Sequence, residues 1–268
     1  MKSGDNRSLR VAILQPSASL RGPEERCAWL DQQTYELIGS DIDLIVCPEL
    51  YMTGYDVGEN LRLNAEPVNG NFATRVSALA EETETAIIYG YPERDGGVLY
   101  NSALCIGADG STLANHRKSV LPPGFELRYF QTGSTLTLLE INSVMVAIVI
   151  CYESEFPESV RNVARLGAEV VVVPTAAVLQ WEQVPTKVIP VRAYENGVFM
   201  LYANYSGKEN ESEYCGRSCV VDPTGGDMAR AGIDEEILVA TLECKAVQTA
   251  RSRLPFLTDY IDIPTDAG

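Results

Sequence analysis

Residues 144–158 read VMVAIVICYESEFPE, and their pattern indicates the class of fold. The run that ends at Ile150 is short, apolar and rich in β-branched residues, which is typical of a buried strand. Apolar side chains then recur at a helical spacing over 155–166, which predicts a helix. Cys151 is therefore expected at a turn between a strand and a helix.

The start of this predicted helix determines the surroundings of Cys151. Ser154 can act as the N-cap, Glu155 falls in the first turn, and Pro157 is tolerated because the first N–H groups of a helix have no partner within it. A helix N-terminus beside Cys151 would favour its thiolate. The segment thus predicts a cysteine placed for chemistry.

Strands and helices alternate along the rest of the chain. Strands are predicted at 11–15, 43–47, 86–91, 99–106, 112–118, 135–141, 143–150, 170–173, 199–203 and 217–221, and helices at 23–38, 72–82 and 187–196. Turn residues typical of hairpins separate several strands, as at 108–111 and 222–226. This mixture predicts an α/β fold with a layered core.

Two stretches share one pattern. Residues 43–50 (DLIVCPEL) and 169–176 (EVVVVPTA) each contain an acid, an apolar strand, a proline and a small turn. We therefore expect two similar halves packed around one core. Because no linker rich in Pro, Gly or Ser divides the chain, we expect a single domain over 1–268.

The composition narrows the classes of function. A formal net charge of −16 argues against binding to nucleic acid or to anionic membranes. No apolar run reaches the roughly 20 residues that span a bilayer, and the polar start MKSGDNRSLR does not resemble a signal peptide. Seven scattered cysteines in such a chain indicate reduced thiols and a cytoplasmic location. With one histidine in the sequence, the pair Cys215 and Cys219 is not expected to bind a metal.

Three predicted strands end in reactive side chains, which are Glu49, Lys118 and Cys151. A thiol nucleophile needs a base, and the oxyanion formed by its attack needs hydrogen-bond donors. Glu49 can supply the base, and Lys118 and the backbone N–H of Tyr152 can supply the donors. Taken singly, each side chain also fits a structural role, as a solvated acid, a surface lysine or a small core residue.

Three stretches surround these residues: CPELYMTGY (47–55), HRKSVLPPGFE (116–126) and CYESEFPE (151–158). Further stretches are VPTA (173–176), RAYENG (192–197), YAN (202–204) and GRSCVVDPTG (216–225). In this order they resemble the motifs of the nitrilase superfamily of carbon–nitrogen hydrolases. The resemblance covers nearly the whole chain, from about residue 9 to about residue 241.

The resemblance implies a four-layer α-β-β-α sandwich without a metal or organic cofactor. It also implies a homodimer or higher homo-oligomer, paired through the helix after the nucleophile and the RAYENG segment. Glu49 matches the general base, Lys118 the cation of the oxyanion site, and Cys151 the nucleophile. Glu126 matches a second glutamate that positions the lysine, although a surface acid in the loop 122–133 is the alternative.

Two residues depart from the family pattern. His116 stands where tyrosine is more common, and a cysteine–histidine mechanism that uses it is an alternative. Glu153 stands where many relatives carry aspartate, and we expect it to cap the following helix.

The residues that follow Cys151 most resemble the corresponding motif of simple amidases, including stereoselective ones. We expect hydrolysis of a small amide to a carboxylic acid and ammonia through a thioester on Cys151. Hydrolysis of a nitrile or an N-carbamoyl compound is the alternative. A catalytically silent binding module is the non-enzymatic alternative, against which the joint presence of Glu49, Lys118 and Cys151 argues.

Aromatic residues near these motifs predict the pocket. Trp181 lies in the loop 176–184, which begins at Ala176, and Tyr55 lies beside the first motif. Apart from Arg128 and Lys187, basic residues are few near the motifs, which favours a neutral or cationic substrate over a dicarboxylate.

Overall fold

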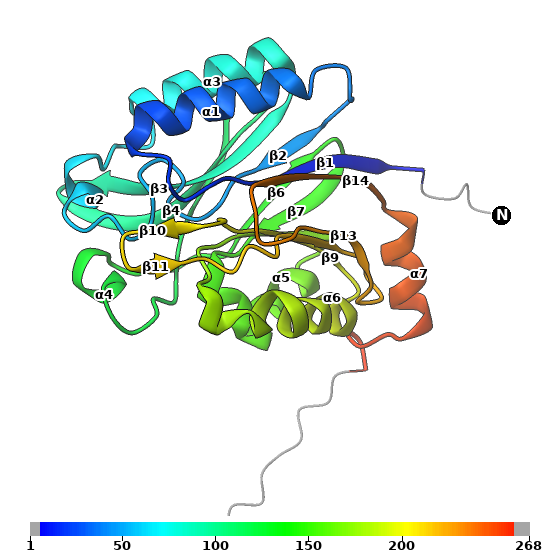
Figure 1. Cartoon of the computed structure of the whole chain (residues 1–268). Helices are drawn as coiled ribbons and strands as arrows, with labels where there is room; N and C mark the ends of the chain where they lie inside the picture. Colours follow the sequence, from blue (N-terminus) through cyan, green and yellow to red (C-terminus); the bar gives the residue numbers. More distant parts are fainter. Residues whose placement is uncertain (1–5, 260–268) are drawn as a thin grey trace, which may run out of the picture.

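The computed structural model describes residues 6–259, which form two stacked six-stranded sheets between two layers of helices (Figure 1). The first sheet contains, in spatial order, β14 (Glu236–Glu243), β1 (Ser8–Gln15), β2 (Leu44–Val46), β3 (Ala86–Asp95), β4 (Val98–Ile106) and β5 (Thr112–Arg117). The second contains β13 (Asp227–Arg230), β12 (Cys219–Val221), β9 (Phe199–Ala203), β8 (Val170–Pro174), β7 (Val144–Ile148) and β6 (Thr137–Ile141). The predicted α-β-β-α sandwich is confirmed.

The two sheets share one topology. The first has three parallel strands, β1, β2 and β3, whose connections carry α1 (Gly22–Glu36) and α3 (Asn71–Thr83). The second has β7, β8 and β9, connected through α5 (Pro157–Arg165) and α6 (Ile189–Asn196). In the first sheet β3 is followed by the hairpin strands β4 and β5, and β14 pairs antiparallel to β1 at the other edge. In the second sheet β9 is followed in the same way by β12 and β13, and β6 pairs antiparallel to β7. The expected similarity of the two halves agrees with this pattern.

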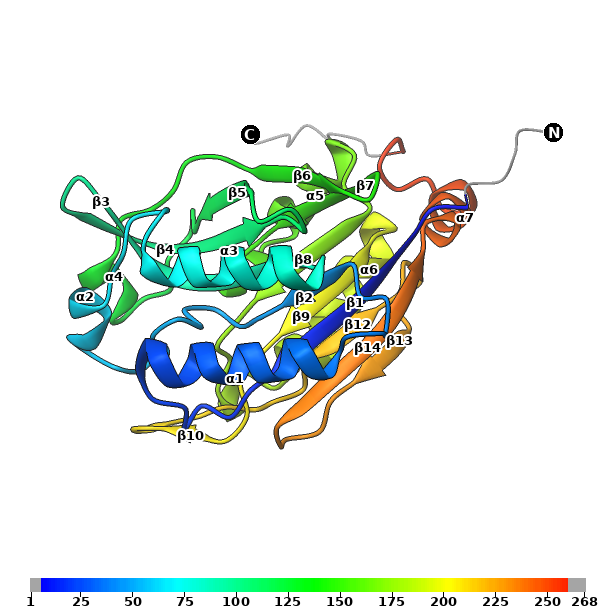
Figure 2. The same ribbon diagram turned by 90° about the horizontal axis from the view of Figure 1, so that it is seen from above.

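Alternating side chains explain the layers. In β8, Val170 and Val172 point into the core between the sheets, whereas Val171 and Val173 pack beneath α5 and α6. All four are buried because both faces of the sheet are covered, which accounts for a continuous valine run. On the opposite side, α1 and α3 lie side by side over the first sheet (Figure 2).

Shorter elements lie around the sandwich. They are α2 (Asn60–Leu63), α4 (Glu126–Tyr129), β10 (Lys208–Glu209), β11 (Ser212–Glu213) and α7 (Lys245–Arg253). The helix α7 lies at one end of the sandwich, where Val247 packs into the core between the sheets (Figure 1). Within residues 6–259, no helix has the length and apolar character needed to cross a membrane.

The helix predicted over 155–166 begins later than expected. Cys151–Glu155 form a 3-10 turn, and α5 starts at Pro157. Ser154 and Glu155 therefore lie in the turn, and their assignment to the N-cap and first turn of the helix is wrong. The Ser154 hydroxyl instead donates a 2.7 Å hydrogen bond to the carbonyl of the first residue of the turn. Pro157 marks the start because its fixed φ suits the first helical position.

Candidate active site

Glu49, Lys118 and Glu126 meet in a cluster whose side chains are fully buried. Lys118 Nζ lies 2.6 Å from Glu49 Oε1 and 2.8 and 3.0 Å from the two carboxylate oxygens of Glu126. Glu126 also accepts a 2.6 Å hydrogen bond from the Tyr55 hydroxyl. It is thus a buried partner of the lysine and not a surface acid.

A tight turn after β2 places Glu49. Gly90 of β3 donates from its N–H to the Pro48 carbonyl at 3.1 Å and accepts from the Met52 N–H at 3.0 Å. A Cβ at position 90 would lie 2.3 Å from the Leu50 nitrogen. Glycine is therefore required for the turn to approach the strand this closely.

Asn101 joins the cluster and was not predicted from the sequence. Its amide Nδ2 donates to Glu49 Oε1 at 2.8 Å and to Glu126 Oε2 at 3.1 Å. The Lys118 N–H donates to the Asn101 carbonyl at 2.8 Å, so the same residue also fixes the backbone that carries the lysine. The sequence feature that could have predicted this role is an amide inside the otherwise largely apolar strand VLYNSALCI, because a buried polar group needs hydrogen-bond partners.

Cys151 adopts φ +48°, a left-handed conformation that residues with a Cβ rarely occupy. The Glu153 carboxylate holds this turn, because it accepts a 2.6 Å hydrogen bond from the N–H of Ile150. It also accepts a 2.8 Å bond from the N–H of Ser119, the residue after Lys118. Glu153 therefore ties the segment of the nucleophile to the segment of the lysine. The expectation that it caps α5 is wrong.

Both ring nitrogens of His116 are engaged. Nε2 lies 2.9 Å from a Glu153 carboxylate oxygen, and Nδ1 lies 3.0 Å from the Thr137 hydroxyl. Burial would raise the pKa of Glu153, but hydrogen bonds from His116, Ser119 and Ile150 lower it. His116 thus stabilises an ionised Glu153, which argues against the cysteine–histidine alternative.

Burial and neighbouring charges together set the pKa values of the cluster and of Cys151. Burial raises the pKa of Glu49 to about 7, against the opposing charge of Lys118. Burial would lower the pKa of Lys118, but the carboxylates of Glu49 and Glu126 outweigh it and raise that pKa. Burial and Glu49 also raise the pKa of Cys151, although Lys118 and the backbone of Ala176 oppose them. The raised pKa favours the neutral thiol over the thiolate that was expected beside a helix N-terminus.

The neutral thiol needs a proton acceptor, and Glu49 offers one. Its Oε1 binds Lys118 and Asn101, whereas its buried Oε2 has no hydrogen-bond partner among the described residues. An ionised carboxylate with one free oxygen can accept a proton from a thiol or a water.

Cys151 faces a cavity of about 570 Å³. Tyr55, Tyr152, Ala176 and Trp181, the predicted pocket residues, all line it. Most of the other lining side chains are apolar or aromatic, such as Phe125. A cavity of this size and character suits a small organic substrate.

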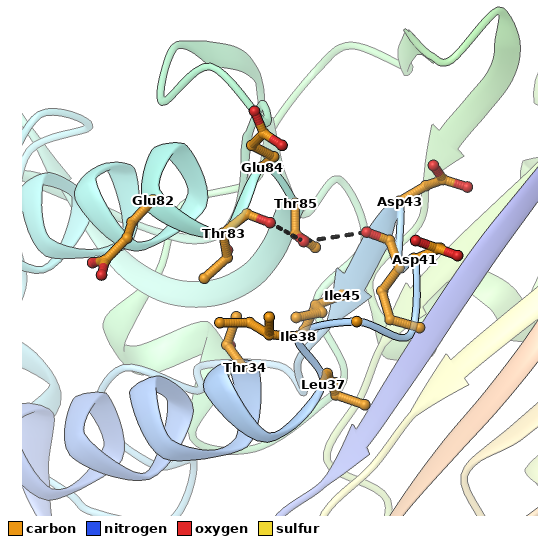
Figure 3. Close-up of a pocket in the computed structure, with 12 residues that line it drawn as sticks. Thr34, Leu37, Ile38, Asp41, Asp43, Ile45, Glu82, Thr83, Glu84 and Thr85 are labelled. Atoms are coloured by element: carbon orange, nitrogen blue, oxygen red, sulfur yellow. Dashed lines mark hydrogen bonds between the residues drawn. The ribbon is translucent and has the colours of Figure 1, made fainter.

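A separate hollow of about 420 Å³ lies where the C-terminal ends of α1 and α3 approach the start of β2 (Figure 3). In Figure 3 the carboxylates of Glu82, Glu84 and Asp43 point away from one another. Across the described part of the chain, no group of three or more His, Cys, Asp or Glu is arranged to hold a metal ion. The cavity at Cys151 is therefore the candidate active site.

Comparison with known protein families agrees with this geometry. Residues 10–252 match the family model described as carbon-nitrogen hydrolase. The chain belongs to the carbon-nitrogen hydrolase family. It is thus an enzyme of the nitrilase superfamily, as the motifs predicted.

This carbon-nitrogen hydrolase has relatives that are named as amidases. It is 33% identical to an (R)-stereoselective amidase of a Pseudomonas species, over 82% of this chain and 80% of the relative. It is 38% identical to a Pseudomonas protegens protein called hydrolase in pqqF 5' region, over 82% of this chain and 78% of the relative. The solved structure of an amidase from Nesterenkonia is similar with a TM-score of 0.84 at 27% identity, covering 94% of this chain and 96% of that one.

Proposed function

We propose that this carbon-nitrogen hydrolase is an amidase, which converts a small amide to a carboxylic acid and ammonia through a thioester on Cys151. The observation that carries the proposal is the position of Cys151, which lines a largely apolar cavity and is subject to the charges of Glu49 and Lys118 in the buried cluster. The amidase-named relatives support the substrate class. In a glutamate-to-glutamine mutant of the Nesterenkonia amidase, fluoroacetamide adds its acetamide moiety covalently to the active-site cysteine.

Acylation begins when Cys151 Sγ attacks the amide carbonyl carbon while Glu49 Oε2 accepts the thiol proton. Lys118 Nζ and the backbone N–H of Tyr152 stabilise the oxyanion of the tetrahedral intermediate. Collapse of the intermediate breaks the carbon–nitrogen bond. Glu49 returns its proton to the departing nitrogen, so that ammonia leaves and a thioester remains.

Deacylation reuses the same groups. A water molecule attacks the thioester carbonyl while Glu49 accepts a proton from it, and the same donors stabilise the second oxyanion. Collapse expels the Cys151 sulfur, which recovers its proton from Glu49. Glu126 keeps Lys118 in place through its two hydrogen bonds, and Tyr55 in turn orients Glu126.

Ammonia release across a panel of amides, N-carbamoyl compounds and nitriles tests the proposal. We expect the highest kcat/KM with amides. Faster ammonia release from nitriles, without accumulation of the amide, would instead assign nitrilase activity. No ammonia from any member of the panel would favour the silent binding module.

The pH dependence of kcat/KM should report the ionisation of Glu49. Because the base acts when ionised and its pKa is raised to about 7, activity should rise as the pH increases through that value. Asn101→Leu removes a hydrogen bond that lowers this pKa, so it should move the rise to higher pH. Asn115→Leu in the neighbouring strand, whose amide binds Glu93, is the matched control and should leave the midpoint in place. An unchanged midpoint in Asn101→Leu would argue against Glu49 as the base.

We also propose that the protein forms a homodimer or higher homo-oligomer through α5 and α6. Leu166, which caps α5, is 61% exposed, and Val191 on α6 is 50% exposed. Pairing these helices across a two-fold axis would bury both side chains. Light scattering should give at least twice the 29.3 kDa mass of the chain, and a stable monomer at micromolar concentrations would contradict the proposal. The shared core supports the proposal of a single domain over 1–268. The seven scattered cysteines support a cytoplasmic location, and the charge of −16 argues against nucleic-acid and membrane partners.

A further inference from the structure

The charges along the Cys151 cavity have one sign. Its ionisable lining residues include two acids, Glu155 and Asp56, and no lysine or arginine of the described chain is among them. Arg128 and Lys187, which the sequence left as candidates, are not part of the lining. The nearby Lys118 is already paired with two carboxylates. The cavity therefore presents negative charge to a substrate.

Of the two acids that line the cavity, Glu155 is the nearer in sequence to the nucleophile, because both belong to the 3-10 turn Cys151–Glu155. It is only partly exposed, and no described residue donates a hydrogen bond to its carboxylate. The nearby Arg192 is engaged elsewhere. It binds the backbone carbonyl of Glu155 at 2.6 Å, and its guanidinium forms a salt bridge with Glu195 at 3.0 Å.

The pKa of the Glu155 carboxyl indicates how this residue would respond to a bound cation. Burial raises the pKa of its carboxyl, against the charges of Lys118 and Arg192, so its ionisation is costly. A positive group on a bound ligand would offset this cost. Glu155 is thus available to bind a cationic group inside the cavity that Cys151 lines.

Asp56 supplies a second carboxylate whose position is fixed. Its N–H donates to Glu209 Oε2 at 2.6 Å, and its Oδ2 accepts a 2.9 Å hydrogen bond from the Ser212 hydroxyl. Both contacts come from the β10–β11 hairpin, so the acid is held in place before a ligand arrives. Little conformational entropy then needs to be lost when a cation binds.

We propose that the natural substrate is an amide whose acyl group carries a positive charge, such as an ammonium or a protonated secondary amine. Glu155 binds this charge and Asp56 adds to the negative potential, while apolar lining residues such as Val178 contact the carbon chain. The net charge of −16 would concentrate cationic substrates around the protein. The proposal rests on the amidase function given above.

An isosteric pair of substrates tests it. In 5-aminopentanamide an ammonium replaces the terminal methyl group of hexanamide, so the two differ mainly in charge. The wild-type ratio of their kcat/KM values should favour the amine by at least about tenfold, and added salt should reduce that ratio. Glu155→Gln should bring the ratio close to one. Glu158→Gln, an exposed acid at the start of α5, is the matched control and should keep the wild-type ratio.

The outcomes distinguish a failure of the cationic substrate from a failure of the amidase function. Hydrolysis of hexanamide without preference for the amine would overturn the cationic substrate and leave the amidase function standing. An unchanged ratio in Glu155→Gln, with an altered mass by light scattering, would assign Glu155 to a subunit interface and overturn its binding role. If the wild-type enzyme hydrolyses neither amide but releases ammonia from other amides of the panel, the cationic substrate alone is overturned. If no amide releases ammonia, the amidase function fails and this inference fails with it.

Discussion

Cys151→Ala is expected to lower kcat for amide hydrolysis by at least about 10³-fold, because the variant has no atom that can form the thioester. The fold should persist, since alanine differs little in volume from cysteine and Cys151 already contacts an open cavity. Circular dichroism and thermal melting should therefore resemble those of the wild type, so that the lost activity is attributable to chemistry.

Cys105→Ala is the matched control for this variant. Cys105 is buried in the core between the sheets, and burial raises its pKa to about 12, so it has no route to a substrate. We expect wild-type-like turnover from Cys105→Ala. Residual activity above about 1% in Cys151→Ala would contradict covalent catalysis by this residue.

Lys118→Met should lower kcat by at least roughly a hundredfold, because it removes the buried cation that we propose stabilises the developing oxyanion. It should also slow alkylation of Cys151 at neutral pH, since the Lys118 charge lowers the thiol pKa against burial and Glu49. Arginine at position 118 should not restore the rate, because a planar guanidinium cannot replace a compact ammonium between two carboxylates 2.6 and 2.8 Å away.

Stability must be separated from rate in the Lys118 variant. Removing one partner of a buried ion pair typically costs about 3–5 kcal/mol, because the remaining charges lose their compensation. A double variant that adds Glu126→Gln to Lys118→Met should recover part of the melting temperature but none of the rate. Arg128→Met, at an exposed position of α4, should change neither the melting temperature nor the rate. Wild-type-like turnover in Lys118→Met would remove the lysine from the mechanism.

The sequence predicted the layers of the fold because they depend on local patterns. The runs around Val46 and Val172 are apolar throughout, which only strands covered on both faces require. The strand β14 was missed because its exposed and buried positions follow no clear alternation. The start of α5 was misplaced because Ser154 fits an N-cap by residue type, although its hydroxyl bonds within the 3-10 turn.

The reactive residues of the site could be predicted, but its supporting contacts could not. Glu49, Lys118 and Cys151 each stand at the end of an apolar run, a feature visible in one dimension. The amide of Asn101 reaches Glu49 across 52 positions, and the Glu153 carboxylate reaches His116 across 37. Such pairings depend on how strands align in the sheets, which the local pattern does not specify.

Mass spectrometry of enzyme quenched in acid during turnover tests most directly for the thioester between the substrate acyl group and Cys151. We expect an adduct with the mass of the amide minus ammonia on the peptide that contains Cys151, together with hydroxamate product when hydroxylamine replaces water. An acyl adduct on any other cysteine, or turnover with neither adduct nor hydroxamate, would contradict it.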